Sequence, residues 1–122
     1  MYSLLVFVLD DAALLRDVLQ AWEDAGAPGA TVLDSTGMRR VSSMFGRDDL
    51  PLLPSLRDLS TREQDVHRTI FTVLDADALV DKVIAATERV VGDLSQPHTG
   101  ILFVLPISRV VGGRMSYKRT QT

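Results

Sequence analysis

The hydrophobic and polar positions in the first part of the chain predict a strand followed by a helix. Residues 3–9 are apolar and rich in β-forming types, which predicts a buried strand. Asp10 and Asp11 follow and offer N-caps to a helix. Up to Ala25 the apolar residues recur every three or four positions, which is the spacing of one helix face, and Gly26 ends the pattern. The predicted buried face contains Leu15, Val18, Leu19 and Trp22.

The regular pattern is interrupted after a second predicted strand, residues 29–36. Residues 37–63 mix arginines, aspartates, serines and two prolines, and they show neither a period of two nor one of 3.6. This segment is predicted to be a long loop or extended arm. Loops of this length in compact domains usually have a function. The alternative is a disordered insertion with no partner.

A strand, a helix and a strand are predicted again after the long loop. Residues 64–75 alternate between two faces, as in a strand, and Asp75 is expected to cap the second helix. Gly92 is expected to end that helix. A last apolar strand follows, and Pro106 is expected to end its ladder because proline has no N–H to donate. The buried stripe of the second helix contains Leu79, Val80, Val83, Ile84, Thr87, Val90 and Val91.

The order of these elements defines the fold class. The order β-α-β, long loop, β-α-β predicts an α+β, ferredoxin-like βαββαβ fold, with an antiparallel sheet and both helices on one face. The 122 residues are expected to form a single domain, residues 1–122. Within it, residues 37–63 form an arm between strands two and three, and residues 113–122 form a C-terminal tail.

The first and last predicted strands, LLVFVL and ILFVL, are apolar on both faces. Both are expected at the centre of the sheet. Two helices cover only one face of such a sheet, and a face that meets water would show polar alternation. A large apolar patch rarely stays exposed on a monomer, so the strands predict a homo-oligomer of closed symmetry. The alternative is a monomer whose long loop folds back over the sheet.

Composition and charge narrow the function classes. The net charge of −3 gives no general attraction to nucleic acid or to an anionic membrane. The absence of cysteine excludes disulfides, thiolate metal sites and cysteine nucleophiles. The N-terminal stretch MYSLLVFVLDD has no basic region, and its apolar run is too short to span a membrane. A cytoplasmic protein without direct membrane insertion is therefore expected.

Few residues suggest catalysis or metal binding. The two histidines, His67 and His98, are isolated in sequence, and no spacing of Asp or Glu around them makes a metal-ligand set. Asp48 and Asp49 are interpreted as a solvated loop tip. No catalytic residue and no metal site are predicted.

Two motifs resemble the PII nitrogen-regulatory and PII-like signalling proteins. FVLPI, residues 103–107, is similar to the F-V-L-P-V end of that family's last strand. GATVLDSTGMRR, residues 29–40, resembles its second strand, where a glycine opens the long T-loop. Residues 37–63, here called the T-loop-like segment, occupy the corresponding position. The resemblance spans nearly the whole chain in layout and implies a cytoplasmic homotrimer that is not an enzyme.

The resemblance also implies an effector and a partner. An adenine nucleotide (ADP, ATP or AMP) would bind between neighbouring subunits, and the T-loop would dock on a membrane transporter or metabolic enzyme. The implied docking residues are Arg47, Leu50, Leu52 and Leu53. The implied effector-binding residues are Thr31, Gly37, Arg39, Arg40, His98, Thr99, Gly100 and Arg114.

The sequence departs from the family where phosphate would bind. The family's phosphate loop reads G-D-G-K, whereas residues 98–101 read H-T-G-I, without the lysine. Gly112 stands where a second arginine is expected. Tight triphosphate binding is therefore not expected, and His98 is a protonatable donor that could partly replace the lysine.

Other functions are compatible with the same fold class. One alternative is a small oligomeric ferredoxin-like enzyme of the dimeric α/β-barrel monooxygenase type, and another is a CutA-like trimer. An RNA-binding module is not favoured, because Phe71 and Phe103 are the only mid-strand aromatics suited to base stacking. Fold alone does not decide among these functions.

Overall fold

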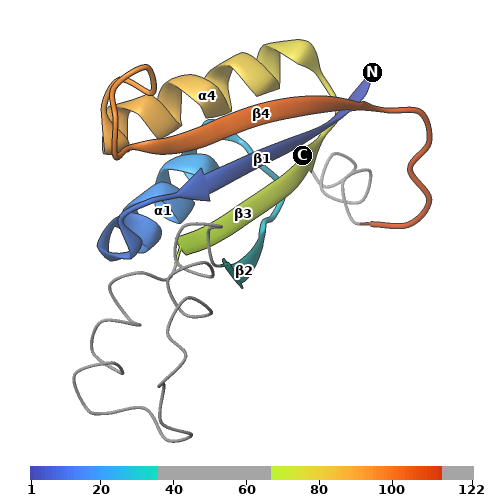
Figure 1. The fold of residues 1–122 in the computed structure, drawn as a ribbon. Coiled ribbons are helices and arrows are strands. Elements are labelled where there is room, and N and C mark those ends of the chain that lie inside the picture. The colour runs from blue at the N-terminus through green and yellow to red at the C-terminus, as the bar shows by residue number, and fades with distance from the viewer. Residues whose placement is uncertain (36–66, 114–122) are drawn as a thin grey trace, which may run out of the picture.

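The computed structural model describes residues 1–35 and 67–113, and it contains the predicted α+β, ferredoxin-like order of elements (Figure 1). These ranges form a four-stranded antiparallel sheet and two longer helices. Residues 36–66 and 114–122 lie outside the described residues. The elements are β1 (Tyr2–Leu9), a 3-10 turn η1 (Ala12–Leu14), α1 (Leu15–Ala25), β2 (Thr31–Ser35), β3 (His67–Leu74), α4 (Asp77–Val91) and β4 (Gly100–Ile107).

The strand order across the sheet is β2-β3-β1-β4. β1 is central, as predicted, but β4 lies at the edge, so the prediction of a central last strand is wrong. That prediction rested on the apolar residues of β4, and an edge strand shows the same composition when its side chains stay exposed. Pro106 also does not end the ladder, because it pairs with Ser3 and Ile107 pairs with Tyr2. Proline is tolerated on edge strands, where one side needs no donor.

The hydrophobic core lies between the helices and one face of the sheet. Alternate residues of β1 are fully buried on that face, and the helices contribute Val18, Trp22 and Val83 to the same cluster. Figure 1 shows α1 and α4 on the same side of the sheet. The period of two in β1 and β3 therefore separates a covered face from an open one. The fully buried strand residues are Leu5, Phe7, Leu9, Ile70 and Leu74.

The helix ends follow the sequence signals with one exception. Asp11 caps η1, since its carboxylate accepts a hydrogen bond from the Ala13 N–H at 3.0 Å. Gly26 ends α1 in the left-handed region, with φ of 109°. The prediction that Asp75 caps α4 is wrong, because Ala76 is the N-cap residue and its carbonyl accepts the first helical hydrogen bonds.

A buried pair of hydrogen bonds joins the two helices, and it gives a testable prediction. The Trp22 Nε1–H donates to Thr87 Oγ1 at 2.8 Å, and the Thr87 hydroxyl donates to the Val83 carbonyl at 2.7 Å. Thr87→Val would leave the indole donor buried without an acceptor. We expect the free energy of unfolding, measured by urea denaturation, to fall by about 1–3 kcal/mol. Thr87→Ser keeps the hydroxyl and should lose less; equal losses in both variants would contradict the hydrogen-bond argument.

Candidate functional site

Four strand ends meet at one end of the sheet, here called the site end. β1 ends at Leu9 and β2 at Ser35, while β3 begins at His67 and β4 at Gly100. Neighbouring strands are antiparallel, so the end of one lies beside the start of the next. The register places Leu9 opposite Gly100 and Ser35 opposite His67. Both junctions with residues 36–66 are therefore at the site end.

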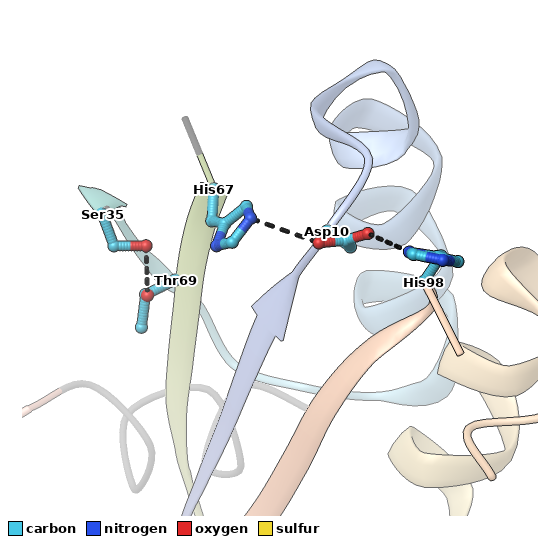
Figure 2. A network of polar contacts seen from close by, with 5 residues as sticks. All are labelled: Asp10, Ser35, His67, Thr69 and His98. Carbon is cyan, nitrogen blue, oxygen red and sulfur yellow. Dashed lines mark hydrogen bonds and ion pairs between the residues drawn. The ribbon is translucent and has the colours of Figure 1, made fainter. Parts of the chain in front are cut away.

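Asp10 stands between two histidines at the site end (Figure 2). Its Oδ1 lies 3.2 Å from His67 Nε2, and its Oδ2 lies 3.9 Å from His98 Nδ1. The three residues come from the end of β1, the start of β3 and the loop before β4. Asp10 was expected as a possible helix cap, but Asp11 has that role, which leaves the Asp10 carboxylate for the histidines.

A hydrogen bond between hydroxyl groups extends these contacts to the second strand. The Thr69 hydroxyl donates to Ser35 Oγ at 2.9 Å, which joins β3 to the last residue of β2 (Figure 2). Thr69 lies two positions after His67 and so shares its face of the sheet. Polar contacts at the site end thus join β2 to β3, and the end of β1 to the start of β3 and to the loop before β4.

The loop before β4 is held by local hydrogen bonds. The Ser95 backbone N–H and hydroxyl both donate to Asp93 Oδ1, at 2.9 and 2.7 Å, and the Thr99 hydroxyl donates to the Gln96 carbonyl at 2.9 Å. The backbone hydrogen bond from Ser95, followed by the hydroxyl bond, lowers the pKa of Asp93 below its ordinary value. This contribution to stability is present above the ordinary aspartate range and is lost as the pH falls through the lowered pKa.

Two residues in this loop have uncommon backbone conformations. His98 has a φ of 67°, in the left-handed region that few residues other than glycine adopt. Gly100 has a φ of 126°, and a Cβ atom there would overlap the Val8 carbonyl oxygen and the Phe7 ring. The loop therefore approaches the end of β1 closely and presents a side chain that is 89% exposed, that of His98.

The structure brings together only some of the effector-binding residues that the resemblance implies. His98, Thr99 and Gly100 are consecutive at the site end. Thr31 is the first residue of β2 and pairs with Phe71, so it lies farther along the sheet than Ser35. The others lie outside the described residues: Gly37, Arg39, Arg40 and Arg114 among the effector-binding set, and Arg47, Leu50, Leu52 and Leu53 among the docking set.

Sequence reasoning did not single out Asp10 as a partner of the histidines, nor Arg68 as a member of the site. Arg68 follows His67 on the opposite face, and its Nε lies 3.3 Å from Asp34 Oδ1. Its Nη1 is buried and has no hydrogen-bond partner in the described part of the chain. The sequence signal that could have singled out Arg68 is its charge, because it shares a face of β3 with Ile70 and that face is otherwise mostly apolar.

The face of the sheet away from the helices, here called the open face, is largely apolar. Phe103 and Leu105 on β4 are 42% and 44% exposed, Ile101 is 59% exposed, and Leu33 on β2 is 52% exposed. Phe103 and Phe71 both pair with Val6, so the two aromatic rings flank the middle of β1. The open face contains Tyr2, Leu4, Val6, Val8, Leu33, Phe71, Val73, Ile101, Phe103 and Leu105.

Within residues 1–35 and 67–113, no group of three or more His, Cys, Asp or Glu side chains could hold a metal ion. In the same ranges, neither helix is long and apolar enough to cross a membrane.

Comparison with known proteins relates this fold to PII. No family model and no curated protein matches the sequence. Among solved structures, the chain is similar to PII from Arabidopsis thaliana, in a crystal structure bound to citrate. The TM-score is 0.61 at 20% sequence identity, and the match covers 93% of this chain and 84% of the plant protein. The protein therefore has a PII-like, ferredoxin-like fold.

Proposed function

We propose that this protein is a non-enzymatic, PII-like signalling protein. It binds a small phosphate-bearing effector, an adenine nucleotide, next to the site end of the sheet, and it docks on a transporter or metabolic enzyme through the T-loop-like segment, residues 37–63. The observation that carries the proposal is the likeness to PII over 93% of the chain. The site end supports it, because both junctions with residues 36–66 lie at the same end of the sheet as the His98 loop.

The described charges favour a ligand with fewer phosphate charges than ATP. His98 is exposed and can donate a hydrogen bond to a phosphate oxygen, and it does so most strongly when protonated. Asp10 brings a carboxylate to within 3.9 Å of the same ring, and that charge repels a highly anionic ligand. The lysine of the family's phosphate loop is also replaced. ADP or AMP is therefore the preferred effector in this proposal.

The open face supports assembly into a homotrimer. Its apolar side chains occupy all four strands, and several are more than 40% exposed in the single chain. A second and a third copy of the chain would bury this surface, because identical sheet faces are apolar in the same places. The trimer is also what the resemblance to PII-like proteins implies. In such a trimer the effector cleft would lie between neighbouring subunits.

Isothermal titration calorimetry with ADP, ATP and AMP tests the effector assignment. We expect ADP or AMP to bind more tightly than ATP. His98→Ala should weaken ADP binding by about tenfold, because a charge-assisted hydrogen bond is lost. Lys82→Ala, which removes an exposed cation in the first half of α4, away from the His98 loop, is the control and should leave the affinity unchanged. Absence of binding by all three nucleotides would reject the effector class, and unchanged affinity in His98→Ala would remove that residue from the site.

A further inference from the structure

Asp10 is the one residue of the described site end that contacts both His67 and His98. His67 begins β3, the strand that follows residues 36–66 in the chain, whereas His98 belongs to the proposed effector loop. The histidines approach different carboxylate oxygens of Asp10, from opposite sides (Figure 2). A displacement of one ring can therefore reach the other through a single side chain.

The two contacts differ in strength. The separation of 3.2 Å between His67 Nε2 and Asp10 Oδ1 is close to hydrogen-bond length, and a neutral imidazole can donate across it. The separation of 3.9 Å between His98 Nδ1 and Asp10 Oδ2 is too long for a hydrogen bond and becomes an ion pair when His98 is protonated. His98 is also the more exposed ring, so it is the member that a bound ligand can move.

We propose that Asp10 is a positioning residue that couples the His98 loop to the start of β3. When the His98 side chain moves toward a phosphate, Asp10 loses one of its two partners, and its contact with His67 changes. The Thr69–Ser35 hydrogen bond carries the change on to the end of β2. The use of this coupling in signalling rests on the proposed function, but the coupling itself is a property of the contacts.

Two other charged residues adjoin these contacts in the sequence, Asp11 after Asp10 and Arg68 after His67. The Asp11 carboxylate accepts from the Ala13 N–H, and Arg68 lies on the other face of β3 beside Asp34.

Hydrogen exchange of the full chain tests the contact. The measured quantity is the protection factor of backbone amides in residues 67–70, corrected for the intrinsic effect of pH. At pH 6, Asp10→Asn should lower protection there by about threefold, which is typical of an exposed charge pair. Asp11→Asn makes the same charge change one position away and should leave protection unchanged. Circular dichroism identifies any variant that does not fold, and Asp10→Glu, which keeps the carboxylate, should retain most of the protection.

The decisive measurement is the effect of His98→Ala on the same amides. His98→Ala should change protection in residues 67–70 in the wild-type background and have no further effect in Asp10→Asn. A change confined to residues 96–101, or an equal change in both backgrounds, would overturn the coupling.

The coupling and the proposed function can fail separately. If calorimetry shows no nucleotide binding while His98→Ala still acts on residues 67–70 through Asp10, the effector assignment fails and the coupling stands. If ADP binds but the double mutant shows no interaction between positions 10 and 98, the coupling is wrong and the proposed function is unaffected.

Discussion

Phe103→Asp is expected to convert the proposed homotrimer into folded monomers. Phe103 lies on the open face and is 42% exposed in the single chain. It pairs with Val6 of β1, and Val6 pairs on its other side with Phe71 of β3. In an assembly with the open faces packed together, an aspartate there would be buried without a partner charge, which is strongly unfavourable. Truncation of a hot-spot aromatic residue costs about 2 kcal/mol or more, and the buried charge adds to that loss, so we expect association to weaken by more than about 100-fold.

Sedimentation velocity at micromolar concentration measures this effect, and circular dichroism confirms that the variant remains folded. Val111→Asp is the control, because Val111 is 87% exposed and lies beyond the last residue of β4. It should leave the assembly intact. A wild-type protein that sediments as a monomer would reject the homotrimer. A Phe103→Asp variant that stays assembled would show that subunits associate through another surface.

Gly100→Ala is expected to destabilise the fold by about 3 kcal/mol, through strain at the close approach between the β4 loop and β1. Gly100 has a φ of 126°, which L-residues rarely adopt, and its missing Cβ would overlap the backbone oxygen of Val8. A backbone oxygen in a central strand cannot move away without disturbing the pairing of β1 with both neighbours. Strain and overlap therefore act together.

Gly92→Ala separates these two causes. Gly92 also has a positive φ, of 93°, but an added Cβ there would meet nothing within 4 Å. We expect it to lower the free energy of unfolding by about 1 kcal/mol, from backbone strain alone. Thermal and urea unfolding of both variants give the comparison. Equal losses would show that the overlap with Val8 is relieved at no cost.

The periodic parts of the sequence predicted the elements well. The spacing of Val18 and Trp22 placed α1, and the alternation through Ile70 and Leu74 placed β3; the structure shows that the face with Ile70 and Leu74 is the buried one. The position of β4 was predicted wrongly, since an apolar strand can be buried by a helix or exposed at an edge, and composition does not distinguish the two. Asp75 was a plausible cap by residue type, but the helix begins one residue too late for it.

The candidate site was only partly predictable. The resemblance placed His98, Thr99 and Gly100 in a loop before the last strand; the structure has His98 and Thr99 in that loop and Gly100 as the first residue of β4. The contact between Asp10 and His67 depends on the register of β1 against β3, which pairs Leu9 with Arg68. No local pattern encodes a pairing between residues so distant in sequence. His67 was therefore read as an isolated histidine.

The central place of β1 has a consequence for how the chain folds. Leu5 pairs with Thr72 on one side and with Val104 on the other, so the first strand of the protein has both partners in the second half of the sequence. Such long-range pairing gives a high contact order, which slows folding relative to helical proteins of the same size. During synthesis, β1 emerges well before either partner exists; it can pair on one side once β3 is made and on both sides only once β4 is made.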